Sequence, residues 1–504
     1  MLLLVLFIAL PLSSALWSDG VQGIDLYGND LSSFSTPDNT TLSCYSACIK
    51  VPSCVAWVLI PSGPCGGENA TCYQKASAAN GTVNACRISG FTPAALLPQA
   101  LETAPVGAVQ PLGWLAAELN VVASGLMGGL PHFWADIANS SFIGGRADGG
   151  LHERTPYYLN GLVPASYLTQ DANLVALRQQ YLGYIIDNQD ASGWIGPDDL
   201  SKDGNQYWSR MNIILALIQH WEGSQNASAI TCIFNYLGEA NRRLATQPLD
   251  GWATVRAQDW IMGIFWLIDN FDTLHGVPAG YSQAWLILLA DTIHAQMLAR
   301  NGDWKTWFDT PAFPQVAACQ GKEPCNMLTH GVNIGQAIKS EAVWYRRSQD
   351  LTDVDSTYIR MRKLDTYHGV PSGMYQADEH LAGNMPSHGT ETCAVVEAVV
   401  SYAQSGAILG DPLLFERAER ITYNALPASM TKDTWERVYL QASNEYNATH
   451  TDPFIWYTDG WCPPRVPPFP PLPSPLPCPL THSSRSLLRA RPPRWRLPRF
   501  WSRK

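Results

Sequence analysis

Nine amphipathic segments follow one another between residues 173 and 424, so a large part of the chain can fold only as packed helices. In each segment apolar residues recur every three to four positions, and Gly, Pro, Trp and Asp occupy the connections. The segments are 173–188, 207–222, 229–247, 260–274, 281–299, 333–349, 354–366, 391–406 and 411–424. Strand-like alternation is scarce, and many helices joined by loops suit a toroid of alternating inner and outer helices. Nine segments are fewer than the twelve that a closed ring of six pairs needs.

A second, smaller unit is indicated by the cysteines. Six of the twelve lie close together, at Cys44, Cys48, Cys54, Cys65, Cys72 and Cys86. This density is typical of a small module held by disulfides; a zinc cluster is the alternative, but no histidine lies nearby. The flanking residues Asp25–Asp30, Cys54–Trp57 and Ser89–Gly90 resemble a PAN/apple-type domain, in which the central helix carries two bridged cysteines. The resemblance implies a module over residues 16–91 that binds polysaccharide or protein.

The N-terminus predicts secretion. Residues 2–12 form an apolar run too short to span a bilayer, and the small residues Ser13, Ser14 and Ala15 follow, so residues 1–15 are interpreted as a signal peptide. Six Asn-X-Ser/Thr sequons fit passage through a secretory pathway. They are Asn39, Asn69, Asn80, Asn139, Asn226 and Asn447. No later segment is expected to cross a membrane.

The candidate active site lies between Gly373 and Glu397, where carboxylates and a thiol precede an apolar helix. Glu391 and Cys393 cannot converge from mid-helix, because positions i and i+2 point to nearly opposite sides. They can converge if Glu391 lies in the extended entry and Cys393 in the first helical turn, and zinc accepts such a sulfur and oxygen pair. The alternative is a structural cysteine beside a glutamate that the helix N-terminus favours.

Five segments together resemble glycoside hydrolase family 127, the β-L-arabinofuranosidase-like proteins. They are Glu153–Pro164, Gly193–Pro197, His330–Lys339, Ala377–Gly383 and Pro386–Glu397. The resemblance covers roughly residues 111–460. It implies an (α/α)6 barrel with β-rich additions over residues 114–460, preceded by a linker at 92–113.

The chemistry that the resemblance implies is retaining hydrolysis of non-reducing-end β-L-arabinofuranosides or similar glycans by a zinc-bound cysteine thiolate. Glu379 matches the acid/base position, where we expect a raised pKa so that the carboxyl keeps its proton. Glu391 and Cys393 match two of the four zinc ligands, and His330 falls in a segment that lines the sugar pocket, although a structural histidine is the alternative. The other two ligands, one of them the nucleophile, form an adjacent cysteine pair, which this sequence does not contain.

The sequence changes character after Gly460, where the pair is expected. Residues 461–504 hold thirteen Pro, eight Arg and one Lys without an acidic residue, and Cys462 and Cys478 lie far apart among prolines. We interpret this segment as an artefact of the gene model that truncates the catalytic domain and leaves it inactive. The alternative is a genuine disordered tail that contacts acidic polysaccharide.

Charge and aromatic content favour a sugar ligand over nucleic acid. The chain carries a net charge of −10 with its only basic stretch in the tail, whereas duplex binding needs a basic surface. Trp and Tyr in predicted loops suit stacking on the C–H faces of sugars, although most are expected to be core residues. Two rival functions remain: a carboxylate-only inverting glycosidase or lyase on the same fold, and a catalytically dead glycan-binding protein.

Overall fold

The computed structural model describes residues 21–442 and 456–457, and all structural statements concern those residues. The gaps are 27, 37–39, 49–53, 55, 77–80, 92–95, 148, 150, 199–206, 272–277, 279–280, 282, 312, 319–324 and 386–387. The predicted signal peptide, the sequons at Asn39, Asn80 and Asn447, and the tail 461–504 with Cys462 and Cys478 lie outside the described residues. Of the other sequons, Asn69 and Asn139 are exposed, and Asn226 is the half-buried N-cap of a helix.

The N-terminal module is an antiparallel sheet with one helix. Its elements are β1 (Val21–Leu26), β2 (Asp30–Thr36), α1 (Thr41–Cys48), β3 (Ala56–Ile60), β4 (Ala70–Lys75) and β5 (Gly81–Phe91), with strand order β1-β5-β3-β4-β2. The disulfides are Cys44–Cys72, Cys48–Cys54 and Cys65–Cys86. Both cysteines of α1 are bridged, as predicted, and they pack with Trp57 in a small core. So small a core needs such cross-links to be stable.

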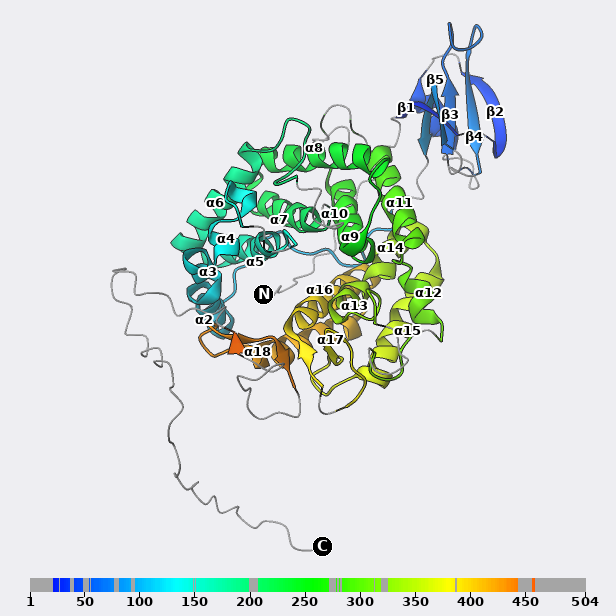
Figure 1. Cartoon of the computed structure of the whole chain (residues 1–504). Coiled ribbons are helices and arrows are strands. Elements are labelled where there is room, and N and C mark those ends of the chain that lie inside the picture. Colours follow the sequence, from blue (N-terminus) through cyan, green and yellow to red (C-terminus); the bar gives the residue numbers. More distant parts are fainter. Residues whose placement is uncertain are drawn as a thin grey trace, which may run out of the picture. The chain divides into compact units, whose positions relative to one another are not determined.

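The rest of the chain forms two rows of helices, one inside the other (Figure 1). The inner row contains α5 (Arg154–Thr169), α7 (Trp208–Ser224), α10 (Ala257–Asn270), α13 (Gly331–Ala337) with α14 (Ser340–Ser348), and α16 (Thr392–Leu409). The outer row contains α6 (Ala172–Asp187), α8 (Ala227–Leu244), α11 (Gln283–Ala299), α15 (Leu351–His368) and α17 (Pro412–Tyr423). The fold is therefore the mainly α toroid that the sequence predicts. Within the described residues the inner row has five positions, so it is short of a six-pair ring.

Shorter elements connect these helices and carry the loops. They are α2 (Gly113–Val122), the π-helical turn η1 (Ala123–Met127), α3 (Gly128–Phe133), α4 (Ala135–Ala138), the 3-10 turn η2 (Ser141–Ile143), α9 (Gly251–Val255), α12 (Trp304–Asp309) and α18 (Ala425–Ala428). A small sheet of order β10-β8-β6-β7 contains β6 (Ala377–Asp378), β7 (His380–Leu381), β8 (Thr390–Glu391) and β10 (Leu440–Gln441). A separate pair contains β9 (Arg437–Val438) and β11 (Trp456–Tyr457).

The two ends of the helical region meet at its outer side. Trp114 at the start of α2 makes an edge contact with Tyr423 at the end of α17, with ring centroids 5.5 Å apart. The backbone N–H of Leu126 donates to the carbonyl of Thr434 at 3.3 Å. Gly129 lies against the ring of Trp435 so closely that a Cβ there would collide with it. These contacts join the two ends of the helical region but leave Trp114 and Tyr423 exposed, at 63% and 38%.

Residues 96–112, which fall in the predicted linker, lie along the helical region. The N–H of Leu97 donates to the carbonyl of Arg346 at 2.8 Å, and the Arg346 Nε donates back to the Leu97 carbonyl at 2.8 Å. Ala100 and Leu101 donate to the carbonyls of Ile408 and Ala407 at the end of α16. This segment therefore bonds the inner helices α14 and α16 together.

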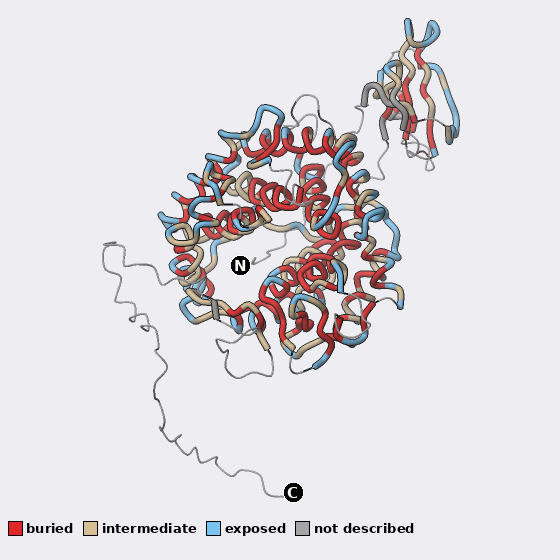
Figure 2. Tube along the Cα trace, viewed as in Figure 1, coloured by how far each residue is buried: buried red, intermediate tan, exposed pale blue. Residues whose placement is uncertain are grey.

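Helix α16 is the one helix of the described residues that is long and apolar enough by composition to cross a bilayer. Most of it is buried within the helical region, as Figure 2 shows for the inner row. Its apolar character is accounted for by this core position, since a helix that is apolar all round is buried.

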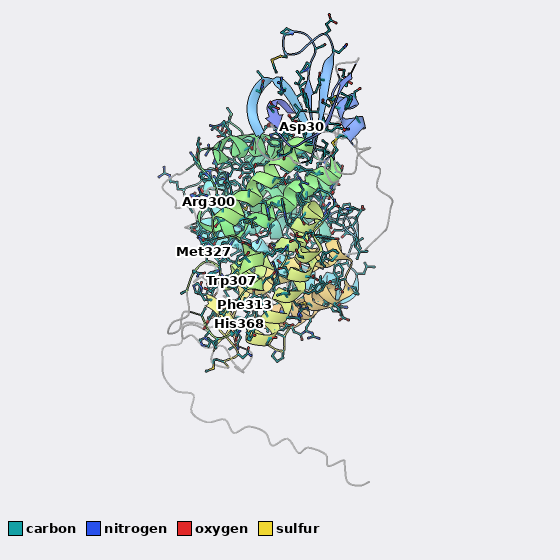
Figure 3. The ribbon with its side chains drawn as sticks, turned by 90° about the vertical axis from the view of Figure 1, so that its right-hand side faces the viewer. Asp30, Arg300, Trp307, Phe313, Met327 and His368 are labelled. Atoms are coloured by element: carbon teal, nitrogen blue, oxygen red, sulfur yellow. A yellow bond between two sulfur atoms is a disulfide. The ribbon has the colours of Figure 1, made fainter. Side chains whose placement is uncertain are left out.

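Acid is expected to destabilise the helical region through His368 at the end of α15. The His368 imidazole is buried against Phe313, accepts a hydrogen bond from the Gly383 N–H at Nδ1, and bonds the Pro314 carbonyl through Nε2 (Figure 3). Burial lowers its pKa to about 4, as it does for His220 and His294. Because the unfolded chain then binds more protons between pH 6.5 and 4, stability falls as pH falls through that window, by up to about 3 kcal/mol per histidine.

Urea unfolding of the chain and of His368→Gln across this pH range measures the effect. The free energy of unfolding of the variant should depend less steeply on pH, by the equivalent of roughly one proton. An unchanged slope would show that His368 does not titrate with unfolding.

Candidate active site

The candidate site is built from residues at the N-terminal ends of the inner helices. Glu153, Arg256, His330 and Glu391 are the N-cap residues of α5, α10, α13 and α16, and Trp208 is the first residue of α7. Helix N-termini present unpaired N–H groups and the positive end of the helix dipole. The fold therefore gathers these five side chains at helix ends that favour anionic groups.

Glu379 lies at the apex of the turn between β6 and β7. The pairs Ala377–Leu381 and Asp378–His380 leave Glu379 alone at the tip, with a left-handed φ of 74°. Its carbonyl accepts a hydrogen bond from the Gly331 N–H at 2.8 Å. A non-glycine residue in this region costs on the order of 1 kcal/mol and is maintained by its surroundings. Here the turn directs the Glu379 carboxylate toward His330 and Glu391.

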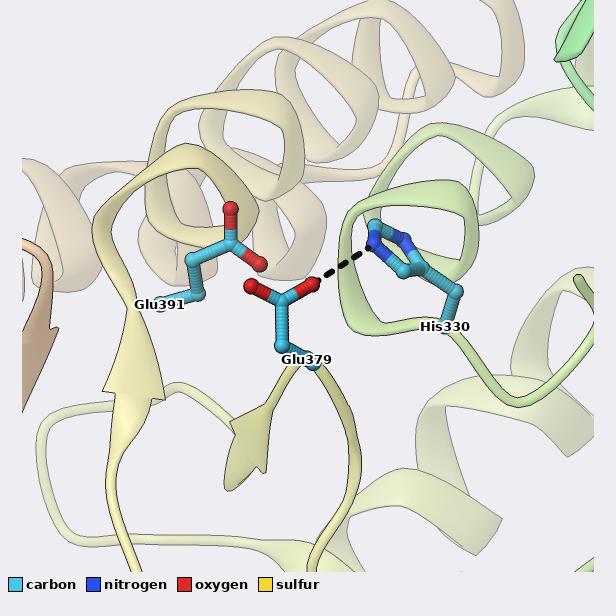
Figure 4. A group of neighbouring side chains, drawn as sticks. All are labelled: His330, Glu379 and Glu391. Atoms are coloured by element: carbon cyan, nitrogen blue, oxygen red, sulfur yellow. Dashed lines mark ion pairs between the residues drawn. The ribbon is translucent and has the colours of Figure 1, made fainter. Parts of the chain in front are cut away.

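These three side chains converge (Figure 4). The His330 Nε2 lies 3.3 Å from the Glu379 Oε2, and one ligand atom from each of His330, Glu379 and Glu391 lies within 4.8 Å of the others. The Tyr439 hydroxyl donates to the Glu379 Oε1. Among the described residues the buried Glu391 Oε2 has no hydrogen-bond partner, which is unusual for a carboxylate oxygen. The group thus offers a nitrogen and several oxygens around one point.

Glu391 and Cys393 adopt the arrangement that the sequence predicts. Glu391 ends β8 in an extended conformation, and α16 begins at Thr392, so that Cys393 lies in the first turn. Cys393 is exposed, and its thiol hydrogen-bonds to the Glu391 carboxylate. Tyr439 reaches the same carboxylate because β10 pairs with β8.

The electrostatics of the group differ from the expectation for an acid at Glu379. The hydrogen bond from His330 lowers the pKa of Glu379, and the Tyr439 hydroxyl adds to this. Burial raises the pKa of Glu391, and the Glu379 charge raises it further. Burial and the neighbouring Glu391 also raise the pKa of the Cys393 thiol well above its usual range. These directions favour the ionised carboxylate at Glu379 and the protonated thiol at Cys393.

Tyr439, Trp252 and Arg256 were not singled out from the sequence. Trp252 meets His330 edge-on at a centroid distance of 5.2 Å, and Arg256 is 4% exposed behind it. No local motif marks these residues; only the helix starts predicted nearby could have indicated Arg256. Of the aromatic residues expected in loops, Tyr158, Trp194, Trp208, Trp304, Trp307 and Tyr375 are buried core residues, while Trp134 and Tyr157 are half-buried.

The left-handed apex gives a stability prediction. Glu379→Gly is expected to be about 1 kcal/mol more stable than Glu379→Ala, because glycine adopts positive φ without the Cβ penalty. At a position with negative φ, the alanine variant would be the more stable of the two. Thermal melts of the two variants measure the difference, and both lose the same carboxylate. An alanine variant that melts higher would show that the turn relaxes to another conformation.

One part of the chain matches a protein-family model. Residues 24–75 match the PAN domain model. No curated protein sequence matches the chain.

Among solved structures, similar chains include a glycoside hydrolase with 12% identity, covering 66% of this chain and 52% of that chain, with a TM-score of 0.45. A GH127 β-arabinofuranosidase has 13% identity, 71% and 59% coverage, and a TM-score of 0.47. A GH127 β-L-arabinofuranosidase from Geobacillus stearothermophilus T6 has 12% identity, 66% and 58% coverage, and a TM-score of 0.48. The chain spans less than two thirds of the length of each.

Proposed function

We propose that the protein is a secreted glycosidase of the family 127 type, which acts on non-reducing-end β-L-arabinofuranosides or related glycans with retention of configuration. The convergence of His330, Glu379 and Glu391, with Cys393 hydrogen-bonded to Glu391, carries this proposal. The disulfide-bonded module supports secretion, since such modules persist in oxidising surroundings. The module then binds polysaccharide or protein near the substrate.

Each residue has a role that its position supports. Glu379, half-exposed at the apex, exchanges the proton of the leaving oxygen, while His330 and Tyr439 orient its carboxylate. Because both partners hold Glu379 ionised, the acid step requires that substrate displaces one of them. Trp252 and His330 form a wall on which a sugar face can pack.

Glu391 and Cys393 would hold zinc. The unpartnered Oε2 of Glu391 and the adjacent thiol fit a borderline-soft cation. Bound zinc would keep a coordinated thiol ionised at neutral pH. Two ligands do not close a tetrahedral site, and the sequence has no adjacent cysteine pair, so we propose that the chain in its present form is inactive.

The spacing of the carboxylates weighs against the inverting alternative. Ligand oxygens of Glu379 and Glu391 lie within 4.8 Å of each other. An inverting pair needs roughly 6.5–9.5 Å between its carboxyl groups to admit a water. Because Glu391 is a zinc ligand in the proposed mechanism, this spacing bears only on the carboxylate-only alternative. A catalytically dead glycan-binding protein remains the second candidate, because the chain lacks the cysteine pair.

The test is to sequence the transcript across Gly460 and to purify the protein it encodes. A cysteine pair, about one zinc per molecule and release of L-arabinose with the retained anomer, seen by NMR, would support the proposal. Glycan binding without turnover, in a protein without the pair, would favour the binding function. Release of the inverted anomer would contradict the thiolate mechanism.

A further inference from the structure

Arg256 is a buried cation placed between two tryptophan rings beside the candidate site. Its guanidinium carbon lies 4.4 Å from the centroid of Trp208 and 4.7 Å from that of Trp252, and the residue is 4% exposed. Cation–π contacts of this kind gain most when they are desolvated. Because the rings cover it, Arg256 cannot itself touch a sugar, and its role must act through its neighbours.

Two sets of contacts connect Arg256 to His330. Trp252 packs edge-on against the imidazole of His330. The Arg256 Nε donates to the Asn333 Oδ1 at 2.7 Å, and the Asn333 Nδ2 donates to the Met327 carbonyl at 2.8 Å. Asn333 and Met327 lie on either side of His330 in the chain. Arg256 therefore fixes both the ring packed on His330 and the backbone that carries it.

On its other side Arg256 anchors the inner helices α5 and α16. Its Nη1 donates to the Tyr157 hydroxyl at 3.3 Å, and that hydroxyl donates to the Glu397 Oε1 at 2.7 Å. The planar fork of arginine can serve Asn333, Tyr157 and two rings at once, which the single ammonium of lysine cannot. Arg256, on α10, thus connects the segment that carries His330 to the inner helices α5 and α16.

We propose that Arg256 is a positioning residue for the candidate acid: it fixes His330, and His330 holds the Glu379 carboxylate in its orientation. The inference rests on the proposed function for its effect on catalysis, but the placement of His330 can be measured without turnover. A displacement of about 1 Å at an acid/base group can lower turnover on the order of a hundredfold.

The first test is the imidazole ¹H–¹⁵N NMR spectrum of the full chain at one fixed pH. The His330 signals are assigned by their loss in His330→Gln. They should shift or broaden in Arg256→Gln and change less in Arg256→Lys, which keeps the charge between the rings. Unchanged His330 signals in folded Arg256→Gln or Arg256→Lys protein would overturn the proposal.

Arg178→Gln is the matched control. Arg178 is also buried, lies 3.8 Å from the centroid of Tyr167, and donates to the Ser166 hydroxyl at 3.0 Å, with no contact to His330 among the bonds of the described residues. Both variants should lower the melting temperature, but Arg178→Gln should leave the His330 signals in place. Equal perturbation of His330 by the two variants would show a general loss of structure and would contradict a specific role.

The second test uses the protein encoded by the sequenced transcript, and it applies if that protein turns over a glycoside. Arg256→Gln should lower kcat about tenfold to a hundredfold, and should add less than about twofold in a His330→Gln background. If the losses of kcat in Arg256→Gln and His330→Gln multiply in the double variant, Arg256 does not act through His330. If the parent protein has no turnover, that result contradicts the proposed function only. The NMR test of the His330 position does not depend on turnover.

Discussion

Glu379→Gln is expected to lower the turnover of substrates with poor leaving groups by about 10²- to 10⁴-fold in the protein encoded by the sequenced transcript. Gln keeps the size and a hydrogen-bond acceptor for His330 and Tyr439, but it cannot exchange a proton with the leaving oxygen. Substrates with activated aryl leaving groups need little protonation, so their loss should be much smaller. The measurement compares kcat/KM for a natural disaccharide and for a nitrophenyl glycoside.

Asp378→Asn is the matched control in the same hairpin. Asp378 is paired with His388 at 2.6 Å, and its neighbour in the ladder is His380. The variant removes one carboxylate from β6 without touching the Glu379–His330 contact, so turnover should change little. Near-normal activity of Glu379→Gln on the disaccharide would remove Glu379 from the mechanism.

The largest stability effect is expected at the buried ion pair between Glu341 and Arg360. Arg360 is fully buried, with its Nη2 on the Glu341 carboxylate and its Nε donating to the Ser356 carbonyl at 3.2 Å. Glu341→Leu would leave a charged guanidinium without its partner inside the core of α14 and α15. We expect a loss of about 3–5 kcal/mol in the free energy of unfolding.

The matched control removes both charges. A Glu341→Leu/Arg360→Met double variant should recover most of the loss, because a desolvated ion pair gains little over apolar residues of similar volume. Urea unfolding of the parent chain, Glu341→Leu, Arg360→Met and the double variant gives the four free energies of unfolding that the comparison needs. Equal loss in the Glu341→Leu and double variants would show that packing, and not the uncompensated charge, sets the cost.

The helical part of the fold could be predicted from the sequence because its periodicity is strong. All nine predicted segments correspond to helices, with bounds that shift by a few residues, and 333–349 is divided into α13 and α14. Helix α5 was not predicted as a helix, since Pro156, Gly161 and Pro164 interrupt its pattern. Proline and glycine disfavour a helix locally, but burial of Leu159, Leu162 and Val163 in the core offsets that cost.

The candidate site could be predicted only in part. The approach of Glu391 to Cys393 requires a helix start between them, and α16 begins there, at Thr392. The lowered pKa of Glu379 could not be foreseen, because its causes lie at His330 and Tyr439, tens of residues away in the chain. The roles of Glu379, Glu391, Cys393 and His330 stay predictions, as do the signal peptide and the interpretation of residues 461–504.

The placement of the site at the helix starts has a consequence for folding. Glu153, Trp208, Arg256, His330 and Glu391 come from five helices, so no local segment can form the site by itself. Their contacts have large sequence separation and arise only when the inner row has assembled. A ligand that contacts all of them would have little affinity for partly folded chains and would raise stability by mass action. Any ligand that needs all five of these side chains would therefore favour chains in which the five helices have assembled.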